Sequence, residues 1–189
     1  MNEPSHWVVR WAHLIPPGGR VLDLACGHGR HARYLASRGH AVLACDRDPL
    51  ALVSLAGVPG VESVQIDLEN DASWPFSDRQ FEAIVVVNYL HRPLFPHLAR
   101  GLTRGGVLIY ETFVLGNECY GKPSNPAFLL ARDELLSEFG GELVVAGFEQ
   151  GRLNRPKPAL VQRLCAVRGE SLENDIESAQ GREEASSRP

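Results

Sequence analysis

The chain has 189 residues, of which 44% are hydrophobic and 22% charged, and its formal net charge is −4. These values are typical of one folded domain with an apolar core, and they exclude a fibrous or wholly disordered chain. The sequence has no apolar run long enough to span a bilayer and no secretion leader, so we expect a cytoplasmic protein without a membrane segment.

Charge is unevenly distributed along the chain. Residues 170–189 contain six acids and two arginines, a net charge of −4, which leaves the rest of the chain near neutral. We therefore expect a folded domain over residues 1–169 and a disordered acidic tail over residues 170–189. A neutral body lacks the basic face that nucleic-acid binding requires, so a small-molecule substrate is favoured over DNA or a large RNA.

Apolar runs of strand length alternate with helix-like segments along most of the chain. Residues 5–14 predict an opening helix, because Trp7, Val8, Trp11 and Leu14 recur at helical spacing. The alternation is typical of a parallel sheet with helices on both faces. Strands are predicted at residues 20–25, 41–45, 61–66, 81–87 and 107–113, and helices at 30–37, 49–56 and 93–102.

The pattern changes after residue 113. Residues 114–129 form a connection longer than usual, which favours a lid or a binding loop over a passive link. A short helix is predicted at 133–139, followed by strands at 142–149 and 160–167. Because no helical pattern separates these two strands, we expect an antiparallel hairpin.

The turn after the first predicted strand carries the clearest binding signal. Residues 27–32 read GHGRHA and match GxGxxA, a turn that lets a ligand approach the backbone at a helix N-terminus. Asp23 lies just before this turn, where a carboxylate would face a cation better than a pyrophosphate. S-adenosylmethionine (SAM) carries an ammonium and a sulfonium and no phosphate, so it fits this acid.

Two more acids follow the next two predicted strands. Asp46 stands where a carboxylate accepts hydrogen bonds from both ribose hydroxyls. Asp67 stands where it would accept from the adenine amino group while the neighbouring backbone amide, at Leu68, meets the ring. We expect Asp23, Asp46 and Asp67 to line one crevice. The alternative for such acids is capping of the following helices, which we prefer only for Asp48.

Residues 21–113 resemble the class I SAM-dependent methyltransferases. The motifs that carry the resemblance agree with that family in type and spacing: DLACGHG at 23–29, Asp46, DL at 67–68, WPF at 74–76, FEAI at 81–84 and NYLH at 88–91.

This resemblance implies an α/β fold with a Rossmann-like seven-stranded sheet, mostly parallel with an antiparallel C-terminal hairpin and helices on both faces. It also implies SAM as the cofactor and methyl transfer as the activity. In the family, the residues that correspond to Cys26, Gly27 and Gly29 approach the methionine and ribose portions, and the Asn88 position contacts the methionine end.

Within that class, GR at 29–30, YLA at 34–36 and residues 128–135 are similar to tellurite-resistance methyltransferases. Those enzymes carry a Leu-His-Arg triplet in the hairpin region, where the histidine and arginine are thought to serve catalysis. The nearest counterpart here is Leu153-Asn154-Arg155, which keeps the arginine and replaces the histidine. Arg155 is therefore a catalytic candidate by resemblance.

Methyl transfer is an in-line displacement at carbon, so alignment and exclusion of water matter most, and a base is needed only for a protonated acceptor. His91 follows the fourth predicted strand and can take a proton near neutral pH; the alternative is that it caps the next helix. Tyr120 is a second candidate near the crevice, either as a catalytic group or as a wall of the pocket.

The hairpin connection is basic. Arg152, Arg155 and Lys157 would suit an anionic small-molecule acceptor, and the alternative is an ordinary solvated loop. No metal is expected, because His28 and His31 straddle the glycine turn without a third ligand. The four scattered cysteines lack a CxxC pair and are expected to be reduced thiols.

Two rival functions remain open. An NAD(P)-dependent oxidoreductase is compatible with the GxGxxA turn and Asp46, but Asp23 and the closing hairpin count against it. The other rival is a non-catalytic protein that binds SAM and serves as a regulator or partner.

Overall fold

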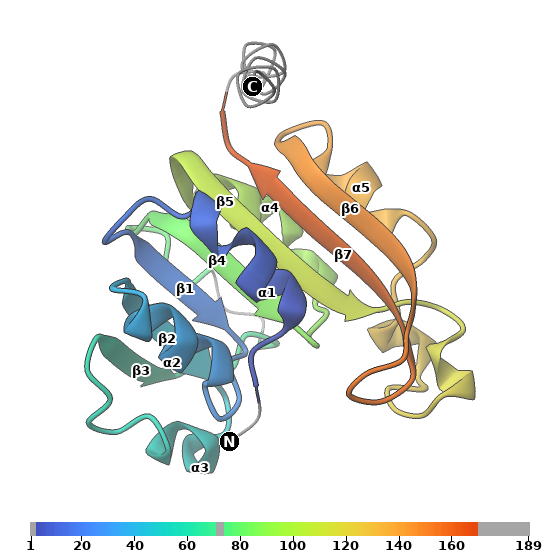
Figure 1. Ribbon diagram of the computed structural model, residues 1–189, viewed down its shortest axis with the longest axis horizontal. Helices are drawn as coiled ribbons and strands as arrows, with labels where there is room; N and C mark the ends of the chain where they lie inside the picture. The colour runs from blue at the N-terminus through green and yellow to red at the C-terminus, as the bar shows by residue number, and fades with distance from the viewer. Residues whose placement is uncertain (1–2, 71–73, 170–189) are drawn as a thin grey trace, which may run out of the picture.

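The computed structural model describes residues 3–70 and 74–169, which form a seven-stranded sheet with helices on both faces (Figure 1). The strand order is β3-β2-β1-β4-β5-β7-β6; strands β1 to β5 pair in parallel, and β7 is antiparallel to both β5 and β6. The predicted fold class is confirmed. The strands are β1 Arg20–Leu24, β2 Ala41–Asp46, β3 Val61–Gln65, β4 Phe81–Val87, β5 Leu102–Phe113, β6 Val144–Leu153 and β7 Ala159–Val167.

The sheet separates two apolar cores. Because successive strand side chains point to opposite faces, Val21 packs with α1, α2 and α3, whereas Leu22 packs with α4 and α5. Strands covered on both faces are apolar almost throughout, as β4 is. The α-helices are α1 His6–Trp11, α2 Arg30–Ser37, α3 Pro49–Val53, α4 Phe95–Gly101 and α5 Glu134–Phe139; the 3-10 helices are η1 Ala12–Leu14, η2 Arg92–Leu94, η3 Asn117–Cys119 and η4 Pro126–Phe128.

Strand β5 begins earlier than the sequence predicts. The sequence predicts a helix to residue 102 and a strand from residue 107, yet residues 102–106 already belong to the strand. Gly105 has a φ of 78° and donates its N–H to the Arg168 carbonyl, while the Arg168 N–H donates to the Gly106 carbonyl at 2.8 Å. These hydrogen bonds to the residue after β7 therefore tie the glycines to the sheet, and the β4–β5 register shifts beside them.

Other element ends differ from the prediction for local reasons. The opening helix changes to 3-10 geometry at Ala12, and α3 ends at Val53. Strand β6 continues to Leu153, because its ladder with β7 runs out to the Leu153–Ala159 pair. Arg152 therefore lies in a strand, and the hairpin connection spans only residues 154–158.

Across the two described stretches, no helix combines the length and apolar character that a membrane crossing requires. The tail predicted for residues 170–189 lies outside the described residues.

Candidate cofactor site

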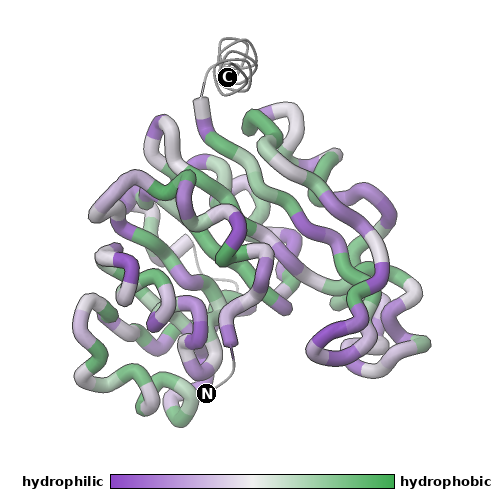
Figure 2. Tube along the Cα trace, viewed as in Figure 1, coloured by the Kyte–Doolittle hydropathy of each residue, from purple (hydrophilic) through white to green (hydrophobic). Residues whose placement is uncertain are grey.

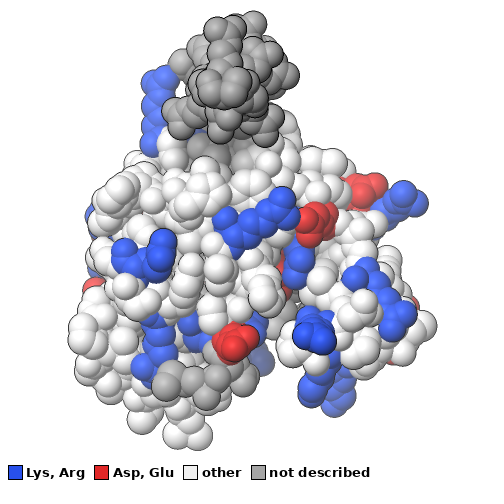
Figure 3. Space-filling model, viewed as in Figure 1, with Lys and Arg blue, Asp and Glu red and all other residues white. Residues whose placement is uncertain are grey.

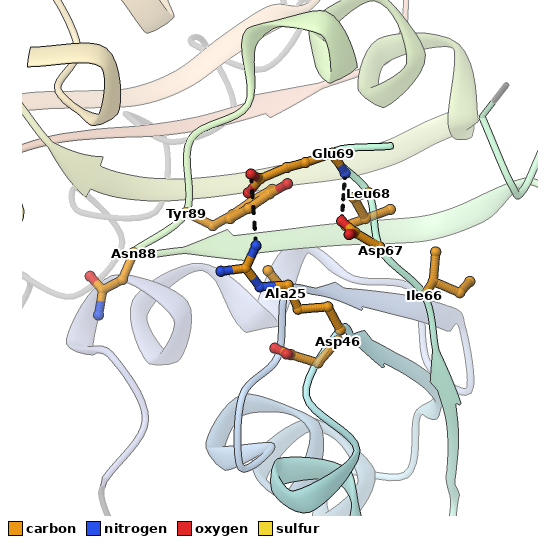
Figure 4. A pocket seen from close by; sticks show the side chains of 9 residues that line it. Ala25, Asp46, Ile66, Asp67, Leu68, Glu69, Asn88 and Tyr89 are labelled. Atoms are coloured by element: carbon orange, nitrogen blue, oxygen red, sulfur yellow. Dashed lines mark hydrogen bonds and ion pairs between the residues drawn. The ribbon is translucent and has the colours of Figure 1, made fainter. Parts of the chain in front are cut away.

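A cavity of about 240 Å³ lies at the carboxyl ends of β1 to β4 (Figure 4). Four of the predicted cofactor residues line it, namely Asp46, Asp67, Leu68 and Asn88. The lining residues that the sequence motifs did not single out for the cofactor flank these positions in the chain or along the sheet edge: Ala25, Arg47, Ile66, Glu69 and Tyr89.

Asp46 is held in one orientation by two backbone donors. Its Oδ2 accepts the Gly27 N–H at 2.7 Å, and its Oδ1 accepts the Asp48 N–H at 2.9 Å. A carboxylate offers about four acceptor positions, so both oxygens retain capacity for further donors. The half-buried carboxylate can therefore accept a vicinal diol without turning.

Asp67 closes its own turn and also forms a wall of the cavity. Its Oδ1 accepts the Glu69 N–H at 3.0 Å within a turn. The described residues that follow Asp67 before β4 form no helix, so the helix-capping alternative does not describe its role. Leu68 belongs to the apolar core on the α4 side, so packing of its side chain holds the turn against the sheet. Glu69 lies 3.9 Å from Arg47, the one cation that lines this cavity among the described residues.

Asp23 lies beneath the glycine turn and does not line the cavity, so the expected crevice contains two of the three predicted acids. Its carboxylate is 1% exposed and accepts the Ala32 N–H at 2.9 Å, which fixes the first turn of α2. Burial raises the pKa of Asp23 to about 7, against the opposing effect of that hydrogen bond.

The two glycines of the turn have different roles. Gly27 has a φ of 53°, and no atom lies within 4 Å of where a Cβ would be, so this side of the turn is open. Gly29 has a φ of 70°, and a Cβ there would collide with the Leu55 side chain. Gly29 is thus required for packing as well as conformation. Cys26 is buried between the strand and the turn, and burial raises the pKa of its thiol.

Two non-glycine residues beside the cavity adopt left-handed backbone conformations. Ala25 has a φ of 54° after β1, and Asn88 has a φ of 59° after β4, the neighbouring strand. Such strain concentrates at functional sites. Asn88 is exposed and lies at the end of the cavity opposite Ile66 (Figure 4).

Tyr89 lines the cavity and also carries an unpartnered polar atom. Its hydroxyl is buried and has no hydrogen-bond partner among the described residues. Burial raises the pKa of the phenol, so the group stays protonated and able to donate. A buried polar atom without a partner is costly, so this hydroxyl is an exception among the buried polar groups beside the cavity.

His91 lies in a second cavity of about 360 Å³, which shares residues 66–69 with the first. His91 stands at the position before η2 but makes no capping side-chain hydrogen bond, so the capping alternative is not what the structure shows. Trp74 and His97 line the same cavity and stack on each other with ring centroids 5.5 Å apart. His91 and Asn88 therefore line different cavities.

Tyr120 and Arg155 lie away from both cavities. Tyr120 is 40% exposed on the long connection, and the Arg152 guanidinium lies 5.3 Å from its ring centroid. Arg155 is exposed in the hairpin connection. Figure 3 shows Lys and Arg side chains gathered at the lower right, over this connection and the neighbouring loop. The three predicted catalytic residues are thus not brought together.

The connection at residues 114–129 is held at two points. Buried Asn117 donates to the Pro123 carbonyl at 3.2 Å and accepts the Leu160 N–H at 3.1 Å. Arg92 donates to the carbonyls of Ala127 and Leu129 at 3.1 and 2.9 Å, and it pairs with Glu134. These hydrogen bonds hold the connection in place beside the start of β7.

No three His, Cys, Asp or Glu side chains gather as a metal site anywhere in the described stretches. His31 is buried and accepts the Ser5 N–H. The four cysteines are free; Cys119 is exposed and the other three are buried.

The strand order, the antiparallel β7 and the acid-lined edge cavity define the class of protein. Residues 21–106 match the model of a methyltransferase-domain family. Residues 21–106 therefore carry a methyltransferase domain, in agreement with the resemblance of the motifs to the class I SAM-dependent methyltransferases. Solved structures described as SAM-dependent methyltransferases share the fold.

Individual proteins resemble the chain at sequence identities between 18% and 31%. The chain is 28% identical to phthiotriol/phenolphthiotriol dimycocerosates methyltransferase 1 of Mycobacterium ulcerans, over 89% of this chain and 66% of that protein. It is 31% identical to tRNA U34 carboxymethyltransferase of Methylococcus capsulatus, over 82% of this chain and 53% of that protein. The chain thus spans between half and two thirds of these relatives. TehB from Haemophilus influenzae shares the fold, with a TM-score of 0.73 and 18% identity over 87% of this chain and 62% of TehB.

Proposed function

We propose that the protein transfers the methyl group of SAM to a small anionic acceptor. The observation that carries this proposal is the composition of the edge cavity, where Asp46, Asp67 and Glu69 outnumber the lone Arg47 among the described lining residues. Such a wall favours a positively charged nucleoside without phosphate over a dinucleotide. Bound SAM would supply an electrophilic methyl carbon on its sulfonium.

Each cofactor residue has a proposed role. Asp46 accepts the ribose hydroxyls, while Asp67 and the Leu68 amide bind adenine. Asn88 contacts the methionine end. Cys26, Gly27 and Gly29 let the methionine and ribose portions approach the backbone, a role that the open side of Gly27 supports. The buried Asp23 carboxylate, beneath the glycine turn, attracts the ammonium group electrostatically.

The acceptor would bind over the hairpin side of the same sheet edge. Strand β7 starts where β5 ends, since Val161 pairs with Phe113, so the exposed Arg152, Arg155 and Lys157 stand at the carboxyl edge. Their charge suits an anion, and Tyr120 beside Arg152 would form part of the wall.

His91 is the proposed base for a protonated acceptor. It lines the second cavity beyond the Asp67–Glu69 wall, away from the basic hairpin connection, so it would serve only an acceptor that binds in that cavity instead. A His91→Ala variant should lose turnover with little change in cofactor affinity. Normal turnover in that variant would remove His91 from the chemistry.

Titration calorimetry with SAM, S-adenosylhomocysteine and NADH tests the cofactor. Methyl transfer from labelled SAM into a metabolite extract, separated by anion exchange, then tests the acceptor. A tRNA fraction belongs in the assay because one relative is named for tRNA. Label in an anionic small molecule supports the proposal, and label in tRNA overturns its acceptor. NADH binding would favour the oxidoreductase, and SAM binding without transfer would favour the non-catalytic alternative.

A further inference from the structure

Ser5 joins the start of the chain to two distant elements. Its N–H donates to His31 Nε2 at 3.1 Å, and its hydroxyl donates to Glu111 Oε2 at 2.9 Å. The same hydroxyl accepts the Trp7 N–H at 3.1 Å and caps α1. Ser5 is 9% exposed, so these hydrogen bonds are shielded from water.

The partners of Ser5 determine where the segment lies. His31 is in α2, which follows β1 and the glycine turn, and Glu111 is near the end of β5. Strand β4 lies between β1 and β5 in the sheet, so a segment bonded to both sides crosses the carboxyl end of β4. Figure 1 shows the N-terminal segment below α1, beside the carboxyl end of β1.

That crossing lies at the Asn88 end of the cofactor cavity. Asn88 follows β4 directly and donates its N–H to the Glu111 carbonyl at 2.8 Å. Glu111 therefore contacts both parts: its carboxylate accepts the Ser5 hydroxyl, and its backbone carbonyl accepts the Asn88 N–H. Arg30 adds a second attachment, from its guanidinium to the Glu3 carbonyl at 3.3 Å.

The attachment is built from paired groups. The Glu111 carboxylate is 6% exposed and lies 2.7 Å from Arg163 Nε. Burial lowers the pKa of His31 to about 3, so the imidazole is neutral and able to accept the Ser5 N–H. Removal of the Ser5 hydroxyl would leave a buried carboxylate short of one donor.

We propose that Ser5 is a positioning residue that holds residues 3–5 across the end of β4 and so closes the amino-acid end of the cofactor cavity. This inference rests on the proposed function, in which that cavity binds SAM with its methionine portion at Asn88. A fixed segment there excludes water from the amino-acid portion and slows its escape.

The test compares ligands with and without an amino-acid portion. Ser5→Ala should raise the dissociation constants of SAM and S-adenosylhomocysteine about tenfold, the effect of one lost buried hydrogen bond. The same variant should bind 5′-methylthioadenosine, which lacks that portion, within about twofold of wild type. Ser5→Thr keeps the hydroxyl and should bind all three ligands as wild type does.

Ser37→Ala is the matched control, because the exposed Ser37 hydroxyl bonds only within its own helix, to the Tyr34 carbonyl. Misfolding of Ser5→Ala would weaken all ligands alike, so the ratio of SAM to 5′-methylthioadenosine affinity is the diagnostic quantity. An unchanged ratio, with wild type binding SAM, overturns this inference alone. Wild type that fails to bind SAM overturns the proposed function and this inference with it.

Discussion

A hydrogen bond of 2.7 Å joins the Gly27 N–H to Asp46 Oδ2 and so links the carboxyl ends of β1 and β2. One carboxylate thereby sets the position of the glycine turn and presents its remaining acceptor capacity to the cavity. The hydrogen bond therefore fixes the Asp46 carboxylate, which would bind the ribose, relative to the backbone of the glycine turn, which the nucleoside would approach.

This relationship makes Asp46→Ala a direct test of the ribose site. The variant should weaken SAM binding by at least about 1 kcal/mol, because two ribose hydroxyls and the Gly27 N–H lose their acceptor. Asp48→Ala is the control, since Asp48 caps α3 through Leu50 and does not line the cavity. Calorimetry measures both, and an unchanged dissociation constant for Asp46→Ala would refute the assignment.

Asp23 predicts a pH dependence of cofactor binding. Its pKa of about 7 means that much of the free protein carries a neutral carboxyl at pH 7. A bound cation favours the ionised form, so SAM should bind more tightly as pH rises through this range, with release of a proton. Calorimetry in buffers of different ionisation enthalpy detects the proton. Asp23→Asn should lose the effect; an equal pH dependence in both proteins would show that Asp23 does not respond to SAM.

His31 predicts a pH dependence of folding stability. Its pKa falls from 6.5 to about 3 because burial disfavours the charged imidazole, with a further effect of Arg30. The stabilisation from a neutral His31 is complete above pH 6.5 and is lost as pH falls from 6.5 toward 3. Denaturant unfolding of wild type and His31→Gln across this window should show a shallower loss in the variant. Parallel curves would contradict the assignment.

The hydrogen bonds from Arg92 to the connection at residues 114–129 predict that loss of this side chain destabilises the fold and loosens the connection. Arg92→Ala removes a forked ion pair to Glu134 and two donors to loop carbonyls, so the free energy of unfolding should fall by about 1 to 3 kcal/mol. Amide exchange should accelerate over residues 114–130, while SAM affinity stays unchanged. Arg132→Ala is the control, because its ion pair with Asp133 involves an 87% exposed side chain. Equal exchange in both variants would show that Arg92 does not hold the loop.

Local sequence patterns determined most of the fold. The bounds of α2 and β4 agree with the prediction because a glycine turn, helical periodicity and a continuous apolar run mark them directly. The start of β5 and the length of β6 could not be predicted, because both depend on contacts distant in sequence. The start of β5 depends on the pairing of Leu102 with Phe81 of β4 and on the hydrogen bonds to Arg168, and the length of β6 depends on pairing with β7.

In the candidate site too, residues placed by local sequence patterns could be predicted and residues placed by distant contacts could not. Asp46, Asp67 and Asn88 reach one cavity because the ends of parallel strands meet at one edge, which the pattern predicts. The depth of Asp23 beneath the turn depends on its hydrogen bond to Ala32, and the placement of His91 depends on how η2 packs; neither follows from spacing. The bridge from Ser5 to His31 and Glu111 involves single polar side chains without a motif.

A crystal structure with bound S-adenosylhomocysteine, set beside a parallel NADH soak, tests the central claim most directly. We predict the ribose hydroxyls within hydrogen-bond distance of Asp46, adenine beside Asp67 and Leu68, and the amino-acid portion at Asn88. Density for the nucleoside elsewhere, or NADH in that cavity, would contradict an acid-lined edge built for SAM.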